Sequence, residues 1–391
     1  MLIEYPYRFE NYGAVRIHET INVLEIDSTN HRGFRGVYSV TYDAIEEYAH
    51  RTAIVIPVKN EDILTLEGVI SAIPHASLVI LISASSRSPV DIYRQEVDLA
   101  RSIHENTRRP IIVAHQRDPV WGEVLRGTPL EDMLDEDGLV RYGKGEGMLL
   151  AAILAAGLGY NYVGYIDSDN YVPGSAHEYS WIYYGGFSLN PGPYVMVRIK
   201  WPYKGKLVGG TSQLYLRRRG RVSRITNAVL NHALSIIRKI ETDIISTANS
   251  GEHAMSTRLA LNMKWAGGFA IESYQLVYLL ESCFLGLDDG QCRFLPEGVT
   301  LYQIQSRNPH IHAERDDEHI VDMVVKSLST IYYSRLNNED VTKRIRSILE
   351  SYNWDRPLPK PRIYDPRGID PEKITTYVIS NSMDIHFFEE R

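Results

Sequence analysis

Four short, almost wholly apolar segments alternate along the chain with longer segments of helical character, and this alternation limits the folds open to it. The apolar segments are Ala53–Ile56, Leu78–Ile82, Ile111–Ala114 and Tyr162–Ile166. Their hydrophobicity is continuous, which is typical of strands covered on both faces. Between them, apolar residues recur at helical spacings of three and four over Asp62–Ala72, Asp91–Asn106 and Gly145–Leu158. The order strand, helix, strand, helix predicts an α/β fold with a Rossmann-like, doubly wound and mostly parallel sheet.

The same order indicates which polar residues matter most. Ligands of such sheets sit at the carboxyl ends of the strands. The residues that follow three of the apolar segments are Pro57–Glu61, Ser83–Ser85 and Asp167–Asn170. These three groups are the first candidates for a binding site.

The pattern is less regular beyond residue 175. Periodicity predicts strands over Tyr194–Ile199 and Phe269–Ile271, the second ending at Glu272. It predicts helices over Ser223–Ile240, Gly251–Met263, Asp316–Tyr333 and Asn338–Tyr352. The first fifty residues give no clear pattern, and the chain contains no internal repeat.

The composition is that of a folded, water-soluble protein. Of the 391 residues, 44% are apolar and 23% are charged, so disorder and coiled coil are poor interpretations. Asp and Glu (49) outnumber Lys and Arg (42), and the net charge of −7 argues against a surface that wraps nucleic acid.

Nothing in the sequence favours export or membrane insertion. The chain begins without the basic and apolar profile of a signal peptide. The uncharged stretch 147–166 contains Gly157, Gly159 and Asn161, so we interpret it as a buried helix and strand. Cys283 and Cys292 are too few for a disulfide scaffold and form no CxxC motif, so the cytoplasm is the expected compartment.

Asp167 and Asp169 follow the fourth apolar segment. Two carboxylates two residues apart at a strand end can share one hard divalent cation, which also accepts diphosphate oxygens as ligands. The alternative is a solvated turn, which Asp, Ser and Asn all favour. The apolar strand in front of the pair favours the metal site.

Two segments at helix starts could hold a nucleotide or a phosphate. Pro57–Glu61 precedes a helix, and Gly143–Gly147 places Lys144 between glycines, where a phosphate could meet both a charge and free amides. The first segment does not match the glycine-rich motifs of dinucleotide-binding or P-loop proteins, so hydride transfer and P-loop chemistry lose their main support. The alternatives are an ordinary capped turn and a flexible loop.

An arginine cluster suggests an acidic ligand. Five arginines occur between Arg217 and Arg224, although the chain is acidic as a whole. Guanidinium groups pair with phosphate or carboxylate oxygens, and a helix is predicted to begin beside them. A solvated basic face or a nucleic-acid patch fits less well, because the flanking sequence has neither aromatic residues interleaved with basic ones nor further basic runs.

Two histidines and two glutamates complete the candidates. His310 and His312 lie in a turn-prone segment, where either could be a metal ligand or a structural histidine. Glu252 and Glu272 are candidates for substrate contact. Glu272 is favoured of the two because it ends a predicted apolar strand.

Taken in order, these motifs resemble those of the mannosyl-3-phosphoglycerate synthases and, more loosely, of the glucosyl-3-phosphoglycerate synthases. The segments that carry the resemblance are PVKNE at 57–61, GKGEG at 143–147, DSDN at 167–170, GRVS at 220–223, SGEHA at 250–254 and NPHIH at 308–312. Each segment is common by itself, but the ordered set is specific and extends over nearly the whole chain.

The resemblance implies a GT-A type glycosyltransferase that transfers mannose from GDP-mannose to the 2-hydroxyl of 3-phosphoglycerate, with retention of configuration. The product would be a precursor of the compatible solute mannosylglycerate. It further implies a divalent metal, with magnesium the first choice and manganese, cobalt or zinc as alternatives. The protein would be a cytoplasmic homodimer with neither nucleic acid nor membrane as partner.

The resemblance also divides the chain into four regions. Residues 1–50 would pack on the core, and residues 51–175 would form the nucleotide-sugar-binding α/β region. Residues 176–315 would bind the acceptor and complete the GT-A core. Residues 316–391 would form C-terminal helices and a tail.

Roles follow residue by residue from the same resemblance. Asp167 and Asp169 match the metal and diphosphate motif, with the metal expected on Asp169 and on His310, or else on His312. The positions that match the nucleotide-sugar site are Pro57, Val58, Asn60, Glu61, Ser83, Lys144 and Ser168. Those that match the phosphoglycerate site are Gly220, Arg221, Val222 and Ser223, of which the last is more often threonine in the relatives.

Other functions remain as alternatives at this point. The nearest is a glucosyl-3-phosphoglycerate synthase. A sugar nucleotidyltransferase would normally carry a glycine-rich basic loop after its first strand, and PVKNE lacks those glycines. A protein that only binds a nucleotide sugar or an acidic metabolite is a further alternative.

Overall fold

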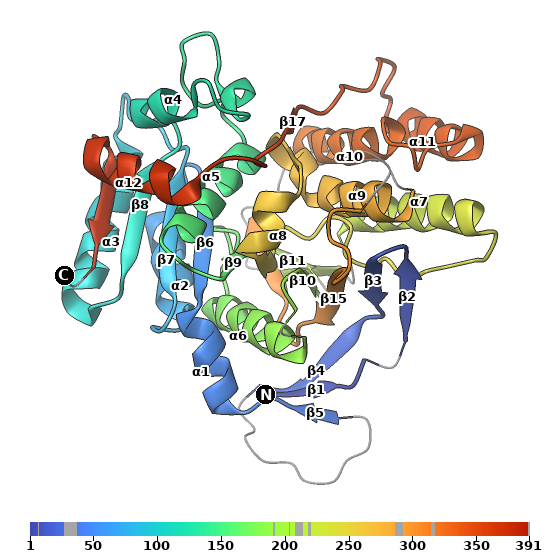
Figure 1. The fold of residues 1–391 in the computed structure, drawn as a ribbon, viewed down its shortest axis with the longest axis horizontal. Coiled ribbons are helices and arrows are strands. Elements are labelled where there is room, and N and C mark those ends of the chain that lie inside the picture. Colours follow the sequence, from blue (N-terminus) through green and yellow to red (C-terminus); the bar gives the residue numbers. More distant parts are fainter. Residues whose placement is uncertain are drawn as a thin grey trace.

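The structure, a computed structural model, describes residues 1–6, 8–26, 37–190, 192–202, 204–207, 214–217, 220–285, 292–313 and 317–389 (Figure 1). These residues form twelve α-helices and eighteen strands, thirteen of which join one large sheet. The N-terminal strands and the C-terminal strand lie at opposite edges of that sheet.

Four parallel strands form the part of the sheet that the sequence predicts. Their order is β8-β7-β6-β9, and the pairs β8·β7, β7·β6 and β6·β9 are all parallel. The strands are β6 (Thr52–Val58), β7 (Leu78–Ser83), β8 (Ile111–His115) and β9 (Tyr162–Tyr165). The connecting helices are α2 (Ile63–Ala72), α3 (Ile92–Thr107), α4 (Pro119–Leu125), the short η1 (Glu131–Met133) and α5 (Lys144–Gly157). The predicted α/β alternation and parallel sheet are therefore confirmed.

Both faces of these strands are buried, which explains why their sequences are continuously apolar. Val55 and Ile80 belong to a core that includes Leu150 of α5. The neighbouring Ile54 and Val79 point the other way, into a second core with helices α2 and α3. Successive residues of a strand face opposite sides, so a strand between two helical layers needs apolar residues at every position.

The sheet continues beyond β9 with mixed strand directions. Strand β13 pairs antiparallel with both β9 and β10, and β10 pairs parallel with β15. The N-terminal strands follow on β15, and β18 pairs antiparallel with β8 at the far edge. The bounds are β1 (Leu2–Glu4), β2 (Phe9–Tyr12), β3 (Val15–His18), β4 (Ile21–Glu25), β5 (Val37–Ser39), β10 (Val195–Lys200), β13 (His253–Ser256), β15 (Val299–Gln305) and β18 (Ile385–Phe388).

Two small sheets and the remaining helices complete the described part of the chain. The small sheets have the orders β12-β11-β16 and β14-β17. Their strands are β11 (Lys204–Leu207), β12 (Leu214–Arg217), β14 (Trp265–Ala266), β16 (His310–Ala313) and β17 (Ile363–Tyr364). The helices are α1 (Tyr42–His50), α6 (Pro173–Leu189), α7 (Arg221–Arg238), α8 (Thr257–Asn262), η2 (Gly268–Ala270), α9 (Ile271–Phe284), α10 (Asp317–Tyr332), α11 (Glu339–Ser351) and α12 (Pro371–Asn381).

Two predicted elements are wrong. The helix predicted over Gly251–Met263 is strand β13 followed by the short helix α8. The strand predicted over Phe269–Ile271 is instead η2 leading into α9, so Glu272 lies in the first turn of a helix. In both places the apolar run is short, and its spacing suits a helix as well as a strand. Contacts with distant parts of the chain decide which of the two forms.

The turn-prone segment of the histidines also contains regular structure. His310 and His312 lie on β16, which pairs parallel with β11. Strand β11 lies about a hundred residues earlier in the chain, so the pairing cannot be predicted from the local sequence.

The two cysteines and the long apolar stretch have clear places in the fold. Cys283 and Cys292 are joined by a disulfide, a single link rather than a scaffold, between the end of α9 and the segment before β15. The stretch 147–166 forms most of α5 together with β9. Across the described ranges, none of the helices combines the length and hydropathy required to cross a bilayer.

Candidate functional site

A cavity of about 600 Å³ opens at the carboxyl ends of the parallel strands. Segments from every predicted motif group line it, including Pro57, Lys144, Asp167, Arg221 and His310. The loops after β6 and β9, the start of α5, the start of α7 and the strand β16 therefore converge on one space. This is the position that ligands occupy in open α/β sheets.

Lys144 lies at the centre of the cavity's charged groups. Its Nζ is 2.6 Å from Oδ1 of Asp167 and 2.9 Å from Oε1 of Glu272. Burial by itself would lower the pKa of Lys144, but the two carboxylates outweigh it and the pKa is raised. Burial would likewise raise the pKa of Asp167, and Lys144 reverses this and lowers it. Lys144 and Asp167 are therefore held in their charged forms.

Gly251 leaves the space that this cluster needs. A Cβ at this position would lie 2.7 Å from Oδ2 of Asp167 and 2.8 Å from Nζ of Lys144. Both distances are shorter than real Cβ contacts, so any side chain here would displace the charged atoms. The glycine of the SGEHA segment is thus a requirement of the site's geometry.

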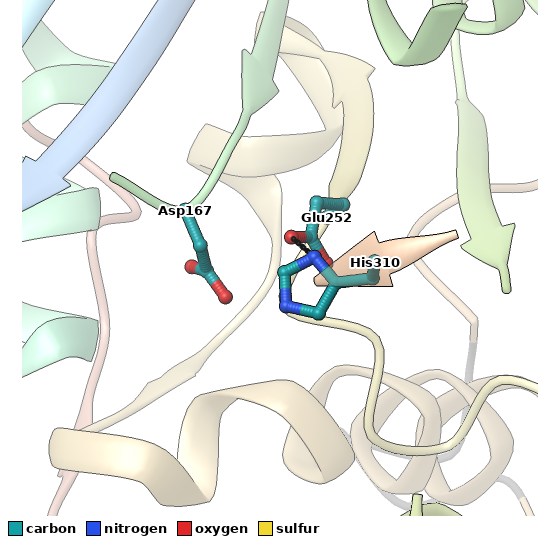
Figure 2. A group of neighbouring side chains, drawn as sticks. All are labelled: Asp167, Glu252 and His310. Carbon is teal, nitrogen blue, oxygen red and sulfur yellow. Dashed lines mark ion pairs between the residues drawn. The ribbon is translucent and has the colours of Figure 1, made fainter. Parts of the chain in front are cut away.

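Asp167, Glu252 and His310 form a group that could hold a metal ion (Figure 2). Their ligand atoms lie within 4.8 Å of one another, and Nδ1 of His310 is 3.2 Å from Oε1 of Glu252. Metal–ligand distances of roughly 2.0–2.6 Å allow one ion to reach donors with that separation. Two carboxylates and an imidazole also suit a divalent ion chemically, so the residues fit such a cofactor.

A second acid–histidine pair lies next to this group. Nδ1 of His312 is 3.9 Å from Oδ2 of Asp169, and the two histidine rings are 5.0 Å apart. The structure thus groups His310 with Asp167 and Glu252, whereas the resemblance favours His310 with Asp169. Both carboxylates of the DSDN segment remain candidate ligands, and Glu252 joins them.

Helix α6 fixes the segment that carries the histidines. The buried carboxylate of Glu178 accepts hydrogen bonds from the backbone amides of Arg307 (2.6 Å) and Asn308 (2.8 Å). Ser175 donates its hydroxyl to the carbonyl of Pro309 at 2.8 Å. The imidazoles therefore approach the end of β9 on a backbone anchored from a second element.

Arg198 of β10 fixes the loop that carries Glu252. Its fully buried guanidinium donates to the carbonyls of Thr247 (3.0 Å) and Glu272 (2.7 Å) and to Oε1 of Gln275 (2.7 Å). Gln275 in turn contacts Nε2 of the buried His253, whose pKa burial and Arg198 both lower. A neutral His253 can accept at Nε2 and donate from Nδ1 to the carbonyl of Ser250, 3.1 Å away.

The start of α7 forms another wall of the cavity. Gly220 is the N-cap, and Arg221, Val222 and Ser223 line the cavity, so the free amides of the first turn lie beside it. Of the predicted arginine cluster, positions 218 and 219 lie outside the described residues, and the side chain at 217 is not described either. Arg224 is exposed and does not line this cavity.

The predicted nucleotide residues divide into two sets. Pro57, Val58 and Glu61 line the cavity, as do Lys144 and Ser168.

The other two, Asn60 and Ser83, do not line the cavity. Asn60 has a left-handed backbone (φ 54°), accepts at Oδ1 from the amide of Ser86 (2.8 Å), and donates its own amide to Oγ of Ser85 (2.7 Å). Ser83 is buried and accepts from the amide of Ser85 (3.1 Å). Both residues shape the loops after β6 and β7.

Several lining residues were not predicted from the sequence. Gln116 follows β8, so the strand-end rule that selected Pro57 and Asp167 could have found it. Tyr142, Trp201 and Phe269 carry no motif signal. Helix α10 contributes His319 and Lys326, which no local feature distinguishes from an ordinary surface helix.

Comparison with known proteins identifies the family of the chain. The family model of the mannosyl-3-phosphoglycerate synthases matches residues 5–378. A mannosyl-3-phosphoglycerate synthase of Aeropyrum pernix is 51% identical over 388 residues, covering 99% of this chain and 100% of the relative. One of Pyrococcus furiosus is 38% identical over 391 residues, covering 98% of both chains.

Solved structures of a glucosyl-3-phosphoglycerate synthase of Mycobacterium tuberculosis are more distant. One, with Mn²⁺, UDP and phosphoglyceric acid, is 21% identical with a TM-score of 0.47, covering 79% of this chain and 86% of that one. Another, with Mn²⁺, UDP-glucose and phosphoglyceric acid, is 19% identical with a TM-score of 0.48, covering 90% and 99%. The full-length matches in sequence, by contrast, are unambiguous: the chain belongs to the mannosyl-3-phosphoglycerate synthase family of glycosyltransferases.

Proposed function

We propose that this chain transfers mannose from GDP-mannose to the 2-hydroxyl of 3-phosphoglycerate with retention of configuration, in a GT-A type site that uses a divalent metal. The observation that carries the proposal is the shared cavity. The DSDN segment, Lys144 and the start of α7 all line it, so a donor and an acceptor can meet there. Had these groups faced different spaces, no single transfer site could be built from them.

The donor's diphosphate would lie at the charged cluster of Lys144 and Asp167. Asp167, Glu252 and His310, with Asp169 and His312 beside them, would hold the metal, which neutralises charge on diphosphate oxygens when it is bound. Lys144 adds a fixed positive charge, and the first turn of α5 adds free amides.

The acceptor would lie at the start of α7. Arg221 and the amides of the first helical turn can bind a phosphate or a carboxylate, and Ser223 offers a hydroxyl. Lys326 of α10 lines the same cavity and adds positive charge for an acceptor that carries both anionic groups, and His319 lines the cavity as well. This arrangement leaves the 2-hydroxyl, next to the carboxylate, free to face the donor sugar.

In the transfer, the bond between the anomeric carbon and the diphosphate breaks while a bond to the acceptor's 2-oxygen forms on the same face. The hydroxyl proton passes to the departing phosphate oxygen, and GDP leaves. The protein's part is to position both substrates and stabilise the leaving charge, with no protonating acid.

The contacts of the buried glutamates support this same-face route over a covalent one. Glu272 is bonded to Lys144, and Glu252 lies against His310, so each carboxylate has a partner that opposes its use as a nucleophile. A covalent route needs an available carboxylate at the anomeric carbon. Trapping a mannosyl ester on Glu252 or Glu272 would therefore contradict the same-face route.

The test is a product assay with two matched arginine variants. The protein is incubated with 3-phosphoglycerate and GDP-mannose, GDP-glucose or UDP-glucose, with and without magnesium, and the product is identified by mass. Arg221→Ala should raise the KM for 3-phosphoglycerate about 30-fold, or about 2 kcal/mol for one charged contact, with little change in the KM for GDP-mannose.

Arg224→Ala is the control. It removes the same charge from the same helix, three residues further on and outside the cavity, and should leave both KM values unchanged. Absence of a mannosylated product would refute the function. Equal effects of Arg221→Ala on both substrates would refute the acceptor assignment alone.

A further inference from the structure

Tyr142 is a large aromatic side chain that stays exposed at the wall of the cavity. The residue is 54% exposed and lines the cavity beside Pro57 and Lys59. Within the described ranges its hydroxyl takes part in no hydrogen bond, so the ring is not held there through its polar end. An exposed tyrosine ring in a binding cavity offers a flat apolar face to a ligand.

Cationic side chains lie next to this ring. The guanidinium carbon of Arg117 is 4.9 Å from the ring centroid, and Nζ of Lys59 is 5.8 Å from it. Arg117 is itself fixed, because Nη1 donates to Oδ2 of Asp135 at 2.5 Å and to the carbonyl of Val140 at 3.2 Å. The ring therefore rests against a guanidinium anchored in the loop before it.

The backbone on both sides of Tyr142 is fixed as well. The side-chain amide of the buried Gln116 donates to the carbonyl of Arg141 (2.6 Å) and to that of Gly143 (3.2 Å). The amide of Arg141 donates to the carbonyl of Met133 at 2.9 Å. The ring is thus positioned before any ligand arrives, which lowers the entropy that binding must overcome.

The position of Tyr142 matches the base end of a nucleoside diphosphate. The residue directly precedes Gly143 and Lys144, where the diphosphate is proposed to lie, and its ring reaches Lys59 at the end of β6. The acceptor wall at α7 belongs to another part of the chain. A donor with its phosphates at Lys144 can therefore extend its base along the β6 side, toward this ring.

We infer that Tyr142 is the stacking surface for the donor's nucleobase and that it favours a purine over a pyrimidine. The inference rests on the proposed function, because it needs a nucleotide-sugar donor. A purine covers more of a tyrosine ring than a pyrimidine does, so the ring contributes more to binding GDP than UDP. The side chain gives the site a preference for the larger base through contact area alone.

The test measures binding without catalysis, by titrating GDP, UDP and inorganic pyrophosphate into the magnesium-loaded protein. Tyr142→Ala should weaken GDP binding about tenfold or more, weaken UDP binding less, and leave pyrophosphate binding unchanged. Tyr142→Phe keeps the ring and should bind all three as the wild type does. Tyr142→Leu keeps apolar bulk without the aromatic ring and should behave like the alanine variant.

Tyr42→Ala is the matched control, because Tyr42 is 53% exposed and lies outside the cavity at the start of α1. Unchanged GDP affinity in Tyr142→Ala would overturn the inference, as would an equal loss for all three ligands. If the wild type forms mannosylated product while Tyr142→Ala binds GDP normally, only this inference fails. If the wild type forms no such product, the proposed function fails instead.

Discussion

Replacing Lys144 by methionine tests whether this lysine acts on the substrate or only neutralises its neighbours. The lysine side chain is 11% exposed, and its partners Asp167 and Glu272 are 26% and 4% exposed. At 2.6 and 2.9 Å and an effective dielectric constant of about 20, each attraction is about 6 kcal/mol before desolvation is subtracted.

The net cost of removing one partner from a buried ion pair is smaller, about 3–5 kcal/mol. Lys144→Met should therefore lower the free energy of unfolding by about 3 kcal/mol, because Asp167 retains some access to water. It should also lower kcat for mannosyl transfer by about a thousandfold, as expected for the loss of a preorganised positive charge at the leaving group.

A second substitution separates these two effects. Glu272→Gln in the Lys144→Met background removes the carboxylate left without its lysine, so part of the lost stability should return. Activity should not return, since the cation at the diphosphate is still missing. Urea denaturation gives the stability, and single-turnover GDP release gives the chemical step. If the double variant recovers activity along with stability, Lys144 serves only to neutralise the carboxylates, and its proposed role at the diphosphate is refuted.

Three further predictions probe the supports of the site and the fold. Gly251→Ala should reduce turnover at least tenfold with little loss of stability, since the nearest atoms to its methyl group are the movable ends of Lys144, Asp167 and Glu272. Normal turnover would contradict the close packing. Glu178→Gln should raise the metal concentration needed for half-maximal activity about 10–100-fold, while the melting temperature shifts little. The reason is that glutamine keeps only one of the two oxygens that accept hydrogen bonds from the backbone amides before His310. Burial, with Arg16 nearby, lowers the pKa of His18 from 6.5 to about 4, so the unfolded chain binds a proton that the folded one excludes. The free energy of unfolding should therefore be highest above pH 6.5 and should fall by up to roughly 3 kcal/mol as the pH drops toward 4. Urea denaturation of the His18→Phe variant over the same pH range should show a smaller fall.

The sequence was most informative where local pattern and tertiary role coincide. Continuous apolar runs predicted the four parallel strands, because a strand between two helical layers has no polar position to interrupt the pattern. The strand-end rule then placed Pro57 and Asp167 at the edge where the cavity lies. The same rule reaches Gln116, and applying it to every strand would have added this residue.

Local pattern was least informative where a distant partner decides the structure. Residues 253–256 form a strand only because β9 and β10 offer edges on both sides. His310 is oriented by pairing with β11 and by Glu178, and neither partner is near it in the chain. Residues such as Lys326 reach the cavity because their helix packs beside it, and this packing cannot be predicted from the local sequence.

Under the proposed function, the distribution of charge around the cavity would direct the two substrates to different groups. The carboxylates of Asp167, Asp169 and Glu272 line the cavity and Glu252 lies beside Asp167, whereas Lys144 forms ion pairs with only two of the four, Asp167 and Glu272. An anionic acceptor is repelled from these carboxylates, while a diphosphate that arrives with a divalent cation is not.

Arg221 and Lys326 line the cavity from the helices α7 and α10, and they would supply the positive charge that the proposed acceptor requires, although Lys326 also pairs with Asp322 at 2.6 Å. A chain with a net charge of −7 has no general attraction for such a molecule, so the attraction must be local. In the proposed site, these two charged groups of one cavity would therefore set which substrate binds beside which group, and the acceptor's hydroxyl would meet the donor sugar between them.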